Sequence, residues 1–163
     1  MIGVGVFGKI PSHGDFVSAG MASPTARSFD KFSQMANDRV AQESNRLPRG
    51  PIGFCFRDEQ GHSLLIGVTV SSRDSAGRKF PLSLFCELTI EDDMQLAGAP
   101  GVFTPAIMQL NRLALDAEAT TIDALKDAVN AIPVPSTEGF SAALRAEVDR
   151  LQEVPLSRVL RRI

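Results

Sequence analysis

Hydrophobic residues follow two different spacings along the chain. Short apolar runs rich in Val, Ile, Leu and Phe occupy residues 2–7, 52–57, 64–70 and 82–90, and such runs bounded by Gly and Pro are typical of β-strands. Between the first two runs, Phe29, Phe32, Ala36 and Val40 recur at helical spacing. This spacing predicts one helix from about residue 24 to about residue 44, opened by Ser23-Pro24.

The three later runs are joined by connectors too short for parallel pairing, which needs a crossover of about a dozen residues or more. They therefore predict an antiparallel meander. From residue 104 to 152 the spacing is helical, with starts at Thr104-Pro105, Thr121 and Ser136 and one apolar face in each segment. We expect an α+β fold, an antiparallel sheet flanked by helices, in one α/β sandwich-like domain spanning residues 1–163.

Gly8, Pro11 and Gly14 interrupt the pattern directly after the first apolar run, so neither a strand nor a helix is expected to continue there. Four polar residue types follow one another in this loop: Lys9, Ser12, His13 and Asp15. The pattern indicates a rigid loop with a polar tip.

Ser12, His13 and Asp15 include the residue types of a hydrolytic triad. A triad needs its base within hydrogen-bonding distance of the nucleophile and an acid behind the base, a geometry that three neighbours on one loop rarely reach. The alternative is that Ser12 and Asp15 cap turns and accept backbone hydrogen bonds, and we favour it.

A second polar connector, residues 71–81, separates two predicted strands. It contains Ser72, Arg73, Asp74, Gly77 and Arg78, followed by Lys79. Because guanidinium groups match carboxylate and phosphate, an anionic partner is one interpretation of this connector. The other is that Asp74 pairs with Arg73 or Arg78 and fixes the loop; both can hold.

Charge and composition exclude several classes of protein. The net charge is −2, which does not favour nucleic acid binding, although residues 1–82 hold 10 of the 17 basic residues and 7 of the 19 acidic ones. This half therefore suits an acidic or phosphorylated partner. Two isolated histidines, His13 and His62, give no metal site, and we expect His62 in a hairpin turn.

The two cysteines, Cys55 and Cys86, each lie singly within an apolar run, so we expect both to be buried free thiols. The chain begins without a signal-peptide pattern, and no apolar run reaches the ~20 residues that span a bilayer, which predicts a cytoplasmic protein without membrane insertion. Residues 154–163 mix apolar and basic residues, as in a terminal helical turn or an interaction tail.

Two segments together carry a resemblance. Residues 7–17, FGKIPSHGDFV, resemble the opening signature of the TagF/ImpM family of type VI secretion-associated proteins, and residues 72–82, SRDSAGRKFPL, are similar to its second signature. The resemblance lies within residues 1–90. Phe29 and Phe32 occupy the helix region where the family usually carries tryptophan.

The resemblance implies a cytoplasmic accessory protein that restrains type VI secretion after translation by binding and sequestering the forkhead-associated (FHA) scaffold protein of the system. It also implies a functional link to a PP2C-type phosphatase, and neither enzymatic activity nor a cofactor. The candidates for partner binding or loop fixing are Lys9, Ser12, Asp15, Ser72, Arg73, Asp74, Gly77 and Arg78. Two alternatives are a dimeric scaffold of the longin or roadblock kind and a hydrolase using Ser12, His13 and Asp15.

Overall fold

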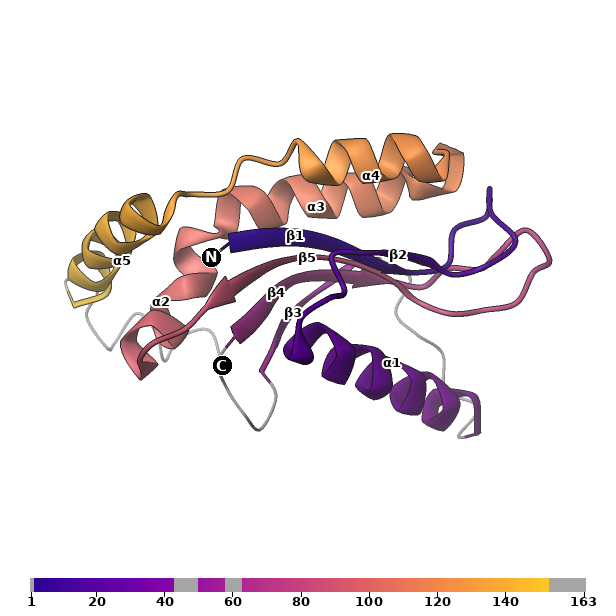
Figure 1. Cartoon of the computed structure of the whole chain (residues 1–163), viewed down its shortest axis with the longest axis horizontal. Coiled ribbons are helices and arrows are strands. Elements are labelled where there is room, and N and C mark those ends of the chain that lie inside the picture. Colours follow the sequence, from indigo (N-terminus) through magenta and orange to yellow (C-terminus); the bar gives the residue numbers. More distant parts are fainter. Residues whose placement is uncertain (1, 43–49, 58–62, 153–163) are drawn as a thin grey trace.

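One antiparallel sheet with helices on both faces makes up the fold (Figure 1). The computed structural model describes residues 2–42, 50–57 and 63–152, so the expected turn at His62 and the tail at 154–163 lie outside the described residues. The five strands of the described sheet, β1 (Ile2–Gly8), β2 (Val17–Ala19), β3 (Ile52–Phe56), β4 (Ser63–Val70) and β5 (Leu82–Thr89), lie in the order β2-β1-β5-β4-β3. Every pair is antiparallel, and β3, β4 and β5 form the meander. The predicted α+β fold is confirmed.

The helices form two layers and an end cap. The helix α1 (Pro24–Gln42) lies on one face of the sheet, while α3 (Thr104–Asp116) and α4 (Ile122–Asn130) lie on the other (Figure 1). The helices α2 (Asp93–Val102) and α5 (Thr137–Gln152) pack together at one end of the sheet. Three helices, α1, α4 and α5, have N-cap residues of the expected kind. Ser23 Oγ accepts from the Ala26 amide, Thr121 Oγ1 from the Ala124 amide and Ser136 Oγ from the Gly139 amide.

Two elements differ from the sequence prediction. The first is β2, three residues in the segment expected to be entirely loop, which pairs with the end of β1 from Val6↔Ala19 to Gly8↔Val17. The second is α2, so the helical half begins at Asp93 and not at residue 104. Gly98 and Pro100 argue against a helix in the sequence, but Gly98 lets α2 approach α5 closely: a Cβ there would lie 2.1 Å from Leu144 Cδ1.

The core is divided between the two faces of the sheet. On the face of α3 and α4, alternate residues of β4 and β5, such as Leu64, Ile66 and Leu84, join the larger apolar cluster. On the face of α1, a second cluster centres on Phe85 and Phe29 and includes Phe7, Leu65 and Phe80. Phe85 is flanked in the sheet by Gly5 and Gly67, and a Cβ at either position would lie within 2.8 Å of Phe85 atoms. Gly5 therefore makes room for the ring on which α1 packs, and Gly67 makes room for the Cα and Cβ from which that ring projects.

The two cysteines lie in different environments. Cys86 on β5 is fully buried, and burial raises the pKa of its thiol to about 12, as expected for an inert core thiol. The prediction for Cys55 is wrong: its side chain is exposed. The reason is that β3 lies at an edge of the sheet, and α1 contacts the alternate residues Phe54 and Phe56. None of the described helices is both long and apolar enough to cross a membrane.

Candidate functional site

The two polar loops singled out in the sequence meet at the end of the sheet opposite to α2 and α5 (Figure 1). One loop, residues 9–16, connects β1 to β2, and the other, residues 71–81, connects β4 to β5. Their backbones touch directly, since the amide of Ser75 donates to the carbonyl of His13 over 2.9 Å. The second loop is also closed on itself by an antiparallel bridge between Arg73 and Lys79.

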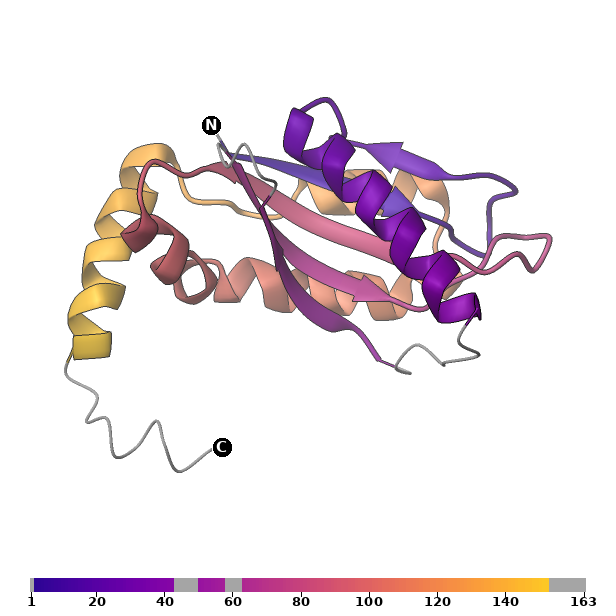
Figure 2. The same cartoon turned by 90° about the horizontal axis from the view of Figure 1, so that it is seen from below.

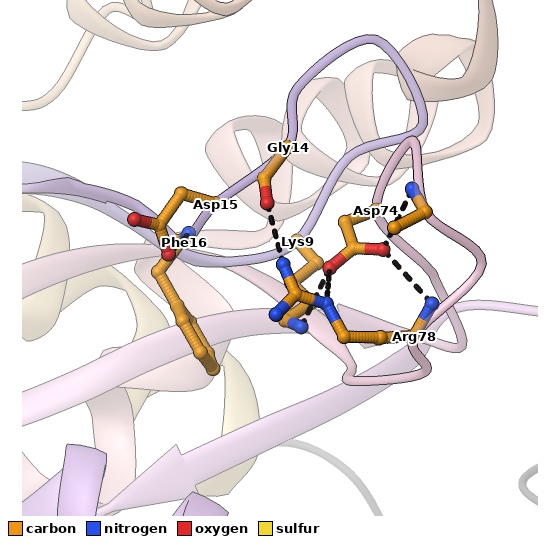
Figure 3. A network of polar contacts seen from close by, with 7 residues as sticks. Lys9, Gly14, Asp15, Phe16, Asp74 and Arg78 are labelled. Atoms are coloured by element: carbon orange, nitrogen blue, oxygen red, sulfur yellow. Dashed lines mark hydrogen bonds and ion pairs between the residues drawn. The ribbon is translucent and has the colours of Figure 1, made fainter.

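A buried carboxylate, Asp74, joins the two loops (Figure 3). Its Oδ2 accepts from Lys9 Nζ at 2.8 Å and from Arg78 Nε at 2.7 Å. Its Oδ1 accepts from the backbone amides of Ala76 at 3.0 Å and Arg78 at 2.8 Å. With 2% of its surface exposed, Asp74 has a donor for each of the lone-pair directions that water would otherwise fill. We call Lys9, Asp74 and Arg78 the loop clamp.

The local sequence explains how Asp74 reaches this position. The amide of Asp74 donates to the carbonyl of Arg78, and the amide of Gly77 donates to the carbonyl of Asp74, which makes a tight turn over residues 74–78. Gly77 has φ +81°, a conformation that glycine adopts with little strain. An Asp at the start of such a turn accepts from the amides that follow it, so the turn and the carboxylate position each other.

Lys9 is buried, with 6% of its surface exposed, although it is a lysine at the start of a loop. Its ammonium is held by Asp74 and lies 4.9 Å from the centre of the Phe16 ring. Phe16 in turn contacts Phe7 and Phe80, with ring centres 5.8 Å and 4.8 Å away. The Lys9 ammonium therefore lies over one ring of a cluster of three, and a cation above a ring face gains further stabilisation.

Arg78 extends the clamp into the first loop. While Nε pairs with Asp74, Nη2 donates to the carbonyl of Gly14 over 2.7 Å (Figure 3). Lys9 and Arg78 hold the pKa of Asp74 well below its usual range, although burial acts in the opposite direction. The clamp carries one net positive charge, and no buried side-chain nitrogen or oxygen among the described residues lacks a hydrogen-bond partner.

The other candidates lie around the clamp without joining it. Ser12 Oγ donates to the carbonyl of Thr120, 2.6 Å away, and thereby attaches the first loop to the segment between α3 and α4. Asp15 is exposed and accepts from the amide of Phe16. Ser72 accepts from the amide of Phe80 through its carbonyl, while Arg73 is exposed to solvent. Ser12, His13 and Asp15 thus have contacts that do not align them as a triad among the described residues.

Some participants could not be read from the sequence. Gly14 and His13 contribute through their backbone carbonyls, which no side-chain pattern reveals. Phe16 was visible as an aromatic residue beside the loop, and its position over Lys9 follows only from the fold. In the part of the chain that the structure describes, no three His, Cys, Asp or Glu side chains gather as metal ligands would.

Comparisons with known proteins agree with this architecture. A crystal structure, PA0076 from Pseudomonas aeruginosa PAO1, is similar with a TM-score of 0.63 and 24% sequence identity, over 90% of this chain and 78% of that chain, which shows a shared fold. No curated protein sequence matches the chain. The family model of the TagF N-terminal domain, described as type VI secretion system-associated, matches residues 5–132, which contain both polar loops, the loop clamp and all five described strands except the start of β1. The chain therefore belongs to the TagF N-terminal domain family of type VI secretion system-associated proteins.

Proposed function

We propose that this protein is a cytoplasmic, non-enzymatic regulator that represses type VI secretion after translation by binding and sequestering the FHA scaffold protein of the system. Membership of the TagF family supports the link to type VI secretion. The observation that carries the proposal further is the loop clamp, which fixes two loops from distant parts of the chain as one surface. A surface that is already ordered loses little conformational entropy on binding.

The charges on this surface suit an anionic segment of the scaffold. Arg73 and Lys79 flank the turn of Asp74 and are exposed, and the side chain of Arg78 is 63% exposed although it belongs to the clamp. Neither Arg73 nor Lys79 forms an ion pair with a described residue. We propose that they contact an acidic or phosphorylated segment, so that a PP2C-type phosphatase acting on the scaffold would change the affinity.

The contacts of Ser12 and Asp15, two of the three residues considered for a hydrolytic triad, support a role without catalysis. Ser12 Oγ donates to the carbonyl of Thr120, the carboxylate of Asp15 accepts from the Phe16 amide, and no hydrogen bond joins either side chain to His13 among the described residues. A nucleophile whose proton is already donated to a carbonyl lacks the base that would activate it.

The test is a binding titration between the purified chain and the FHA scaffold in its phosphorylated and dephosphorylated forms. Arg73→Ala combined with Lys79→Ala should weaken binding at least about a hundredfold, because each charge-assisted hydrogen bond contributes about 1.5–3 kcal/mol and every ~1.4 kcal/mol is tenfold in affinity. The matched control is Arg112→Ala with Arg145→Ala, two exposed cations on α3 and α5. Arg78 is left intact because its loss would also disturb Asp74.

Three outcomes would contradict the proposal. The folded wild-type chain could fail to bind the scaffold in either form. The loop variant could bind as well as the wild type, which would exclude the cationic surface. Secretion could also be unchanged in cells that lack the protein, which would exclude repression.

A further inference from the structure

One aromatic ring of the first polar loop is fixed in place and yet open to solvent. Phe16 is 41% exposed, whereas Phe7 and Phe80, on which its ring packs, are 6% and 5% exposed. The Phe7 ring is nearly parallel to that of Phe16, at 19°, and the Phe80 ring meets it edge-on. A ring held by two neighbours has little rotamer freedom left, so covering its remaining surface with a partner costs little conformational entropy.

The guanidinium of Arg78 is fixed in a similar way and keeps one nitrogen available. Its Nε donates to Asp74 and its Nη2 to the carbonyl of Gly14. Its Nη1 forms no hydrogen bond with a described residue, and the Arg78 side chain is 63% exposed. Because two of its nitrogens are already engaged (Figure 3), an arriving acceptor meets a guanidinium whose orientation is set in advance.

The ring and the guanidinium are close neighbours, joined through Lys9 and Asp74. Lys9 Nζ lies 4.9 Å from the centre of the Phe16 ring and 2.8 Å from Asp74 Oδ2. The same oxygen lies 2.7 Å from Arg78 Nε. Figure 2 shows the two loops that carry these groups projecting beyond the end of the sheet. On an extended segment, side chains two positions apart share a face and lie roughly 6.6 Å apart, so one such pair can reach both groups.

The charges around this pair favour a carboxylate over a phosphate at Arg78. The loop clamp carries one net positive charge, because Asp74 offsets one of its two cations. A single carboxylate cancels that charge, whereas a phosphate monoester carries about −1.5 to −2 at neutral pH. The excess negative charge of a phosphate would lie near Asp15, whose exposed carboxylate points away from Arg78 (Figure 3). The side chain that binds at Arg78 is therefore an acidic one.

We propose that Phe16 and Arg78 determine the specificity of the two polar loops, by binding an extended segment with an acidic side chain and an apolar side chain two positions apart. The carboxylate accepts from Arg78 Nη1, and the apolar side chain packs on the exposed surface of the Phe16 ring. The inference rests on the proposed function for the identity of the partner, the FHA scaffold, and narrows the contact to a segment of this pattern. Arg73 and Lys79 remain available for further negative charges on the same segment.

The first test uses peptides and does not require the scaffold. Acetylated and amidated GESFG carries the pattern, GQSFG removes the charge, GESAG removes the ring, and a fourth peptide has phosphoserine in place of glutamate. Each is titrated into the labelled full chain while amide NMR signals are followed. GESFG should give saturable shifts at Gly14, Phe16 and Arg78. GQSFG and GESAG should each bind about tenfold more weakly, because each loses one contact, and the phosphoserine peptide should bind no more tightly than GESFG.

The second test changes the chain. Phe16→Ala should bind GESFG about tenfold more weakly and should no longer distinguish GESFG from GESAG, because the ring that reads the apolar side chain is gone. A purely structural effect on the loop would leave that distinction in place. Phe32→Ala is the matched control, since Phe32 is 54% exposed on α1, outside the two loops, and it should bind all four peptides as the wild type does.

Several results would overturn the inference. The wild type could give no saturable shift with GESFG, bind GESFG no better than GQSFG or GESAG, or bind the phosphoserine peptide more tightly, which would assign Arg78 to a phosphate. These comparisons need no variant of the chain, so they decide the inference even if Phe16→Ala does not fold. Titration with the scaffold separates the two proposals: equal binding by wild type and folded Phe16→Ala overturns this inference alone, whereas a scaffold that binds neither overturns the proposed function.

Discussion

The junction between β1 and the first polar loop depends on a glycine that no other residue can replace without cost. Gly8 has φ +136°, a region that residues with a side chain rarely adopt. A Cβ at this position would lie 2.1 Å from the carbonyl oxygen of Pro81 and 2.7 Å from Leu82 Cα. Both atoms belong to the backbone that enters β5, so no side-chain rotation can relieve the clash. Gly8→Ala therefore tests whether this close approach makes the junction before Lys9 rigid.

The expected loss of stability in Gly8→Ala has two parts, backbone strain and overpacking. Alanine variants at Gly77 and Gly3 allow the two parts to be measured separately. The backbone conformation costs about 1–3 kcal/mol and the overpacking another ~1–3 kcal/mol, so Gly8→Ala should lose about 2–6 kcal/mol. Gly77 has φ +81°, and a Cβ added there would meet no atom within 4 Å, so Gly77→Ala should lose only about 1–2 kcal/mol. Gly3 lies on the same strand as Gly8 with open space around it, and Gly3→Ala should change stability by less than about 1 kcal/mol.

Urea unfolding and calorimetry of the three variants measure these differences. For a domain of this size each kcal/mol shifts the melting temperature by about 2–4 °C, so a loss of about 4 kcal/mol in Gly8→Ala lowers it by about 8–16 °C. Circular dichroism checks that each variant folds before it is compared. Equal stability of Gly8→Ala and Gly3→Ala would refute the reasoning, because it would mean that the loop junction yields without cost.

Three further predictions concern the clamp, the α1 face and the hydrolytic residue types. Because the pKa of Asp74 is depressed in the folded protein, its carboxylate stabilises the fold above its unfolded pKa of about 3.9, and this contribution is lost as the pH falls through the folded value. Asp74→Asn should lower the urea midpoint at pH 7, with a difference from wild type that shrinks below about pH 4; a difference independent of pH would contradict this. Phe29→Ala, at a position 4% exposed, should lose about 3–5 kcal/mol in calorimetry, whereas Phe32→Ala on the same helix, 54% exposed, should lose less than about 1 kcal/mol; equal losses would be inconsistent with the packing. Ser12→Ala combined with His13→Ala should keep scaffold binding and repression of secretion, and loss of repression in a folded variant with intact binding would point to chemistry instead.

The sequence predicted the strands of the meander and the start of α1 well because local spacing decides these elements. Residues 52–57, 64–70 and 82–90 alternate or run apolar over the length of a strand, and Ser23-Pro24 marks a helix start with little ambiguity. The helix α2 was missed because its stability comes from tertiary contact. Gly98 and Pro100 lower its local helix propensity, and its packing against Leu144 of α5 compensates.

The candidate site likewise combines a contact that local sequence predicts with contacts that depend on the tertiary fold. The residue types suggested that Asp74 pairs locally with Arg73 or Arg78, and the structure contains the pair with Arg78. The partnership of Asp74 with Lys9 joins residues 65 positions apart, and it depends on β1 and β5 being neighbours in the sheet. The exposure of Cys55 has a similar cause, because an apolar run does not show whether its strand will lie in the centre of a sheet or at its edge.

The position of β1 next to β5 also sets the order in which the fold can form. Ile2 pairs with Leu88 and Phe7 with Ser83, so the first strand has no β5 to pair with until some eighty residues more have been synthesised. At roughly 5–20 residues per second, this interval lasts on the order of ten seconds. During that time β1 can pair only with β2, through Val6, Phe7 and Gly8, whereas β3, β4 and β5 can pair in succession as they emerge. The clamp between Lys9 and Asp74 can close only after this late pairing, which makes it a marker of completed folding.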